Sequence, residues 1–227
     1  HLRRAIAHFP SPRISAMVLE RYFVAGGKNP DDAFRTPGMM GLRPPLDLVG
    51  TVVLANFVEV WLAKEGHEGV VGLNLLDKIQ MPNLASIYGG MLAGLDYVLM
   101  GAGIPWQVPG LMDRLAKSEV AKMRVTLEDD PQNVGAEIVF DPAMILENPP
   151  TELKRPRFLA IISATPVAQA LLKRATGKID GFVVEGATAG GHNAPPRGVL
   201  KLTGDGEPIY GERDVAEADQ QVRDPRV

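Results

Sequence analysis

The sequence predicts an α/β fold in which short apolar strands alternate with helices and form a parallel sheet. Two observations carry this prediction. Short, continuous apolar runs, typical of strands buried on both faces, recur along the chain. Between them, apolar side chains recur at the spacing of amphipathic helices. This alternation favours either a closed barrel or an open doubly wound sheet, and both folds bind ligands at the carboxyl ends of the strands.

The first half of the chain carries the first part of this pattern. The spacing of Ile14, Met17, Val18 and Tyr22 predicts a helix, and the prolines between residues 25 and 45 predict a loop. The expected helices of this half lie at residues 11–23, 57–64, 84–95 and 108–115. The expected strands lie at residues 51–55, 69–73, 96–100 and 120–127. Three of these strands are followed by a polar residue or glycine, namely Asn56, Asn74 and Gly101. Asn56 is also a good N-cap for the helix that follows it.

The second half begins with an interruption of the pattern. Residues 128–156 are interpreted as an insertion that carries an extra strand at 136–140. The pattern resumes with a strand at 158–162, a helix at 166–175 capped by Thr165, and a strand at 180–184. Ser163 and Glu185 follow these two strands. Because the chain is polar and aperiodic after Leu202, we expect one domain over residues 1–227 that is a piece of a longer protein.

The composition excludes several classes of function. The net charge is −3 with acidic and basic residues interleaved, so no basic face for nucleic acid is expected. No apolar run is expected to reach the 18 or so residues of a membrane helix. The absence of cysteine excludes disulfides, thiolate metal sites and a cysteine nucleophile, and no metal is expected. This composition suits a reducing cytoplasm.

The motif that stands out is the segment 185–198, which directly follows a predicted strand. Its glycines permit positive φ and a close approach of the backbone to a ligand; they include Gly186, Gly190 and Gly191. His192 lies between these glycines and a pair of prolines. A histidine held in this way is suited to act as a general base, since its ordinary pKa lies near neutrality. The alternative, a surface histidine in a glycine loop, stays open.

Four segments, at residues 55–64, 74–82, 100–105 and 185–192, resemble the nitronate monooxygenases, formerly called 2-nitropropane dioxygenases. The resemblance extends over about residues 1–213. The related flavin-dependent enoyl-acyl-carrier-protein reductases share the style of the last segment. The resemblance implies a (β/α)8 TIM-type barrel with FMN at the carboxyl ends of its strands. The glycine-rich first strand and the later glycine pair that cradles the FMN phosphate are not found, so we expect an incomplete barrel.

The resemblance also implies roles for individual residues. Asn74 matches an asparagine beside the flavin, and Glu185 matches an acidic residue near the ribityl chain. Ser163 has a strand-end position that also faces the flavin, and Gly186, Gly190 and Gly191 belong to the same cofactor loop. His192 matches the histidine that takes a proton from a neutral nitroalkane. The flavin then oxidises the nitronate, and O2 reoxidises the flavin.

Two other functions remain open on the sequence. One is an NAD(P)H-dependent flavin reductase that acts on enoyl thioesters or quinones, because the loops that would separate it from a monooxygenase cannot be interpreted from the sequence. The other is a non-catalytic fragment or subunit without flavin. The expected partners are a small nitronate-like substrate and O2, with homo-oligomer formation left open.

Overall fold

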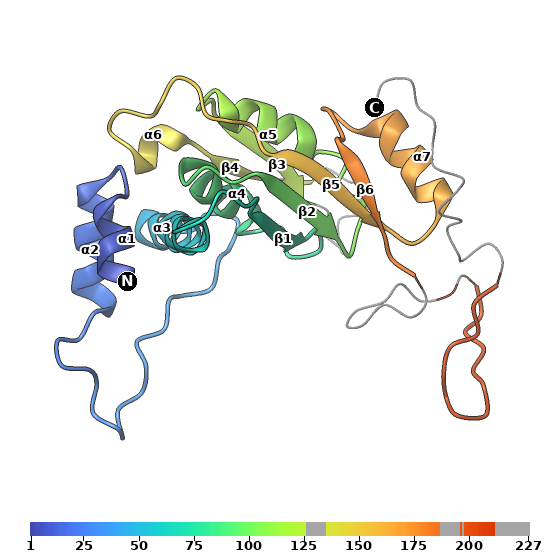
Figure 1. The fold of residues 1–227 in the computed structure, drawn as a ribbon, viewed down its shortest axis with the longest axis horizontal. Helices are drawn as coiled ribbons and strands as arrows, with labels where there is room; N and C mark the ends of the chain where they lie inside the picture. Colours follow the sequence, from blue (N-terminus) through green and yellow to red (C-terminus); the bar gives the residue numbers. More distant parts are fainter. Residues whose placement is uncertain (126–134, 187–195, 197, 212–227) are drawn as a thin grey trace.

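The computed structural model describes residues 1–125, 135–186, 196 and 198–211. Its helices are α1 (Leu2–Ala7), α2 (Pro12–Tyr22), α3 (Leu46–Ala63), α4 (Asn83–Leu92), α5 (Val108–Ala116), α6 (Pro142–Ile145) and α7 (Thr165–Arg174) (Figure 1). Its strands are β1 (Gly72–Leu76), β2 (Tyr97–Gly101), β3 (Ala121–Val125), β4 (Ala136–Phe140), β5 (Arg157–Ile162) and β6 (Gly181–Val184).

Four of the strands form one parallel sheet in the order β1-β2-β5-β6. The order along the sheet is the order along the chain, so the winding never reverses. Because parallel crossovers are right-handed, this order places the crossover helices on one face of the sheet. The predicted α/β fold with a mostly parallel sheet is confirmed. Within the described residues the sheet is open, and no closed barrel is present.

The two faces of this sheet differ in burial along its central strands, β2 and β5. Val98, Met100, Phe158, Ala160 and Ile162 are buried and belong to the main hydrophobic cluster, together with residues of α4, α5 and α7. The alternate positions point the other way and are half-buried or exposed. They are Asn74 and Leu76 on β1, Leu99 on β2, Leu159 and Ile161 on β5, and Val183 on β6. We call these six residues the open face.

The run at residues 51–55, predicted as a strand, lies inside α3, and so does the expected helix at 57–64. The prediction was wrong because the β-branched residues there are buried by neighbouring helices, and such packing overrides propensity. Of the residues of α3, only Ala55, Glu59 and Ala63 are exposed, a stripe at four-residue spacing. Asn56 is therefore not a helix cap. Its side-chain amide donates to the Val52 carbonyl oxygen at 2.9 Å and to Ser86 Oγ at 3.2 Å.

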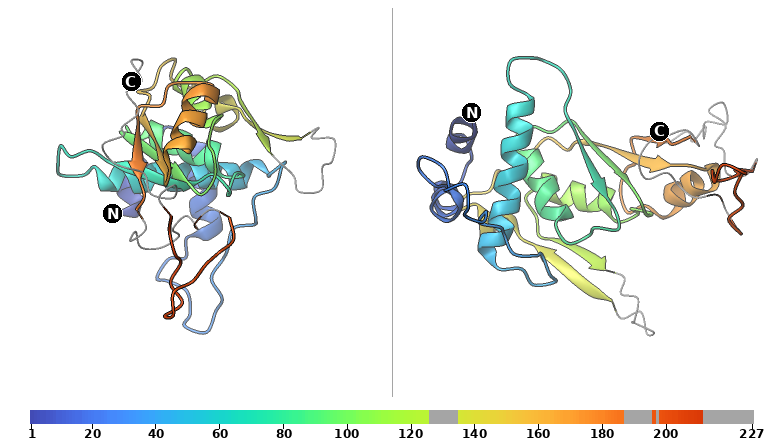
Figure 2. Two further views of the ribbon diagram at one scale, coloured as in Figure 1. Left: turned by 90° about the vertical axis from the view of Figure 1, so that its right-hand side faces the viewer. Right: turned by 90° about the horizontal axis from the view of Figure 1, so that it is seen from below.

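Helix α3 also corrects the expectation that no apolar segment reaches membrane length. It has 18 residues with a mean hydropathy of 1.7, which is enough by length and composition to cross a membrane. The core helix of a water-soluble protein meets the same criterion. Here α3 lies between α4 on one side and α1 and α2 on the other (Figure 2). Its contact with α4 is so close that a Cβ at Gly89 would overlap the carbonyl oxygen of Val53.

The third and fourth strands form a separate antiparallel ribbon, in which Met123 pairs with Ile138 (Figure 2). The prediction that the strand at 120–127 joins the parallel sheet was therefore wrong. Along β3, Ala121, Met123 and Val125 are buried while Lys122 and Arg124 are exposed. This alternation is typical of a one-sided antiparallel strand and not of a strand buried on both faces.

Helices α1 and α6 were not predicted, and the other elements agree with the predictions to within a few residues at their ends. Strand β1 begins three residues later than expected, so Asn74 is its third residue and does not follow it. Thr165 is the first residue of α7 and not its cap; Ala164 occupies the N-cap position without a side-chain hydrogen bond. At α2 the side chain of Ser11 accepts a hydrogen bond from the Ile14 N–H.

Candidate functional sites at the ends of the strands

The carboxyl edge of β5 and β6 brings two of the predicted cofactor residues together. The Glu185 N–H donates to the Ile162 carbonyl oxygen at 2.8 Å, which continues the ladder one step beyond β6. Since Ile162 pairs with Val184, the same register places Ser163 beside Glu185. Both side chains are half-buried, and by alternation both point to the side of the open face. Gly186 follows and is exposed, and a Cβ added there would meet no atom of the described residues within 4 Å.

Asn74 shares the open face with these residues but not the edge. It is exposed, and it lies in one row with Leu99, Leu159 and Gly181. Along the strands, this row lies four residues before Glu185, a separation of about 13 Å. Across the sheet, β1 is three strands away from β6, a separation of about 14 Å. Asn74 was expected to follow its strand as Ser163 and Glu185 follow theirs, but it does not meet them at one rim. Gly101, the last residue of β2, lies nearer to the edge, beside Ile161.

The remaining predicted site residues, His192, Gly190 and Gly191, lie outside the described residues. Two other histidines have structural roles. The ring of His67 bonds the Ala63 carbonyl oxygen at 2.6 Å through Nε2 and accepts from the Gly69 N–H at 2.9 Å through Nδ1, so it caps the end of α3. His8 stacks on Trp61 with ring centroids 4.8 Å apart.

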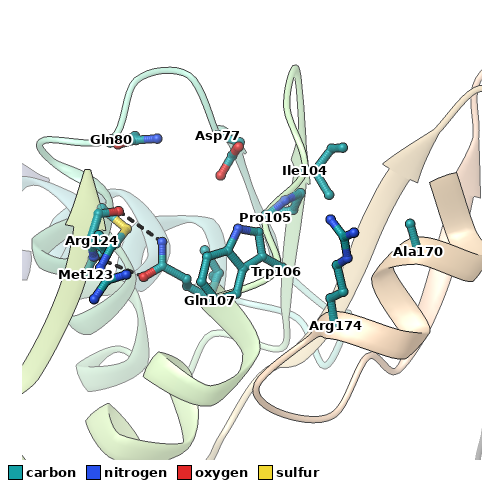
Figure 3. A pocket seen from close by; sticks show the side chains of 11 residues that line it. Asp77, Gln80, Ile104, Pro105, Trp106, Gln107, Met123, Arg124, Ala170 and Arg174 are labelled. Atoms are coloured by element: carbon teal, nitrogen blue, oxygen red, sulfur yellow. Dashed lines mark hydrogen bonds between the residues drawn. The ribbon is translucent and has the colours of Figure 1, made fainter. Parts of the chain in front are cut away.

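A cavity of about 610 Å³ lies beside the carboxyl ends of β1 and β2 (Figure 3). Its walls come from the loops after these two strands, from β3 and from the last turn of α7. Its polar and aromatic lining includes Asp77, Gln80, Trp106, Gln107 and Arg174. None of the predicted cofactor residues Asn74, Ser163, Glu185 and Gly186 lines it. The described part of the chain therefore holds two separate candidate sites, the edge at Ser163 and Glu185 and this cavity.

Asp77 follows β1 directly, and burial raises the pKa of its carboxyl while a hydrogen bond from the Ile104 N–H partly opposes this. The Asp77 N–H in turn donates to the Gly101 carbonyl oxygen at 2.8 Å. A Cβ at Gly103 would collide with the Asp77 carboxylate. Residue 103 must therefore lack a side chain for Asp77 to hold its place against the loop after β2.

The floor of the cavity is fixed by hydrogen bonds. The side-chain amide of Gln107 donates to the Arg124 carbonyl oxygen and accepts from the Arg124 N–H, both at 2.9 Å. Thr176 binds the same segment: its N–H donates to the Trp106 carbonyl oxygen at 2.9 Å, and its hydroxyl donates to the Gln107 carbonyl oxygen at 3.0 Å. These bonds join the start of α5 to β3 and to the end of α7.

Sequence reasoning missed this cavity because its residues come from four separate segments. The one sequence feature that indicated this cavity was Asp77, a charged residue directly after an apolar run. Trp106, which lines the cavity, is 39% exposed.

No protein-family model, curated protein or solved structure matches this chain. The assignment of function therefore depends on the residues and their geometry.

Proposed function

We propose that this protein is an FMN-dependent oxidoreductase of the TIM-barrel kind, and that it oxidises alkyl nitronates or nitroalkanes with O2. The observation that carries the proposal is the position of Glu185, the first residue of the segment 185–192. Glu185 lies at the carboxyl edge of the parallel sheet, directly after β6 and beside Ser163. This is the edge where α/β proteins bind their ligands and cofactors.

The strand order supports a barrel over a doubly wound sheet. A doubly wound sheet reverses its winding at a switch point, and ligands bind there. The order β1-β2-β5-β6 has no reversal, as in a barrel. In that interpretation the open face is the inward-facing side of the barrel wall. The leucines, isoleucine and valine of this face have the apolar, branched character of barrel interiors.

The residues present suit a flavin at this edge. The open face is apolar apart from Asn74, while Ser163 and Glu185 supply hydrogen-bonding groups at its rim. Because a Cβ at Gly186 would meet no atom of the described residues within 4 Å, a ligand can approach the backbone closely there. Ser163, Glu185 and Gly186 would hold the cofactor at this edge together with Gly190 and Gly191, and Asn74 would contact it farther along the open face. When bound, FMN supplies the redox chemistry, accepting electrons from the substrate and passing them to O2.

The protein's own contribution to the chemistry is proton transfer. A neutral nitroalkane must lose its α-proton before it can be oxidised, and in this proposal His192 takes that proton. A nitronate arrives already deprotonated, so it needs no base. The glycines before His192 and the prolines after it would hold the imidazole at a fixed place beside the substrate.

The test is an absorption spectrum of the purified protein, followed by two aerobic assays. We expect flavin absorption that FMN restores after its removal, and turnover of alkyl nitronate without NADPH. If turnover occurs only with NADPH and a quinone, the protein is the NAD(P)H-dependent flavin reductase and not the monooxygenase. A colourless protein that binds no added FMN would overturn both.

A further inference from the structure

We propose that the cavity between the loops after β1 and β2 and the last turn of α7 is a second binding site, for a planar heteroaromatic anion of mononucleotide size. The site lies apart from the edge at Ser163 and Glu185, since none of the described residues proposed to hold the flavin (Asn74, Ser163, Glu185 and Gly186) lines it. The inference goes beyond the proposed oxidation reaction and does not depend on it.

One charged group at the cavity has unmet bonding capacity. Arg174 is an exposed cation that forms no ion pair or hydrogen bond with any residue in the described part of the chain.

The geometry separates the polar groups along the cavity. Figure 3 shows Gln80 and Arg174 on opposite sides, with the ring of Trp106 between them and the carboxylate of Asp77 above it. The carboxylate of Asp77 therefore marks an end that accepts hydrogen bonds, and Arg174 forms a cationic end. Gln107 adds no polar contact, because both ends of its amide already bind the backbone of Arg124.

These features define the ligand. The cationic end suits phosphate or carboxylate, which arginine binds through charge-assisted and bidentate hydrogen bonds. The accepting end needs N–H donors. The exposed indole between them favours a flat ring, since aromatic rings stack on one another. A volume of about 610 Å³ is in the range of small-molecule sites. A base with an amino group, linked to a phosphate, has all of these properties.

The experiment is a calorimetric titration of the full chain with 5′-AMP, which we expect to bind. Adenosine, which lacks the anion, and inorganic phosphate, which lacks the ring, should each bind at least about tenfold more weakly. No binding of 5′-AMP, or binding of adenosine that is equally tight, would overturn the proposal.

Variants locate the binding in the cavity. Arg174→Gln should weaken 5′-AMP binding by about tenfold to a hundredfold, the usual range for charge-assisted hydrogen bonds. Lys173→Gln is the matched control, since it removes the same charge from the adjacent, exposed position of α7. Equal effects of the two changes would mean that only general charge matters, which contradicts a built site.

Discussion

Gln107 and Arg124 exchange two hydrogen bonds of 2.9 Å, in which the side-chain amide of one residue pairs with the backbone of the other. A planar amide presents a donor and an acceptor as a neighbouring strand would. The start of α5 is therefore bound to β3, although β3 belongs to the two-stranded ribbon and not to the parallel sheet.

The first prediction tests this contact. Gln107→Glu keeps the size of the side chain but replaces the N–H donor with a carboxylate oxygen that faces the Arg124 carbonyl oxygen. We expect the free energy of unfolding, measured with urea, to fall by about 1–3 kcal/mol. Gln169→Glu, at an exposed position of α7, should change it by less than about 0.5 kcal/mol. Similar losses from both changes would show that the added charge acts, and not the lost pairing.

The second prediction concerns two adjacent glycines in α4. Alanine at either position should favour the helix by about 1 kcal/mol. At Gly89, however, the new Cβ would overlap the carbonyl oxygen of Val53, which is backbone and cannot rotate away. At Gly90 it would meet only Leu95 Cδ2 at 3.0 Å, the end of a flexible side chain. We expect Gly89→Ala to destabilise the protein by about 1–3 kcal/mol in thermal unfolding, while Gly90→Ala is neutral or stabilising.

Should Gly89→Ala match Gly90→Ala in stability, the close approach of α3 and α4 would be wrong. That outcome would also remove the packing explanation for the apolar composition of α3.

The third prediction concerns pH. Asp96 binds the ammonium groups of Lys154 at 2.6 Å and Lys64 at 2.5 Å, and it accepts a hydrogen bond from the Val71 N–H at 2.9 Å. These interactions, that with Lys154 foremost, hold the pKa of the Asp96 carboxyl well below its usual range. Its stabilisation is thus fully present above the unfolded-state pKa of about 4 and is lost as the pH falls below it.

We therefore expect Asp96→Asn to lower the free energy of unfolding by about 1–3 kcal/mol at neutral pH. The difference from the wild type should shrink as the pH falls from about 4 to 2. Asp31→Asn, at an exposed position of the loop after α2, is the control and should show neither effect. A difference that stays constant down to pH 2 would contradict the ionic role of Asp96.

The fourth prediction tests the proposed base. His192→Asn should lower the turnover of a neutral nitroalkane by about 10²–10⁴-fold, the usual range for a lost general base. Turnover of the preformed nitronate should fall far less. Equal losses on both substrates would assign His192 to binding or positioning. Unchanged rates with FMN bound would remove it from the mechanism.

The sequence predicted the elements whose pattern is set by their own residues. Strands β2, β5 and β6 and helices α4, α5 and α7 lie within a few residues of their expected positions. It failed where tertiary packing overrides local preference. The β-branched run beginning at Thr51 is helical because α3 is buried among other helices, and the stripe of Ala55, Glu59 and Ala63 was the overlooked signal.

The site was predictable only in part for a related reason. Ser163 and Glu185 follow β5 and β6 directly, so a strand-end argument finds them. Asn74 was misplaced because β1 begins three residues later than its apolar run suggests. The cavity needs the spatial meeting of Gln80, Trp106 and Arg174, which no local pattern encodes.

The order of the strands has a consequence for the folding kinetics. Gly72 pairs with Tyr97, and Leu159 pairs with Gly181, so the two outer pairs close short loops. The central pair joins Tyr97 to Arg157 across more than twice that length of chain, including the ribbon of β3 and β4. Contacts between distant segments slow folding, because their loop entropy is lost before the contacts stabilise the chain. We therefore expect each half of the sheet to nucleate separately, with the docking of β2 on β5 as the rate-limiting step.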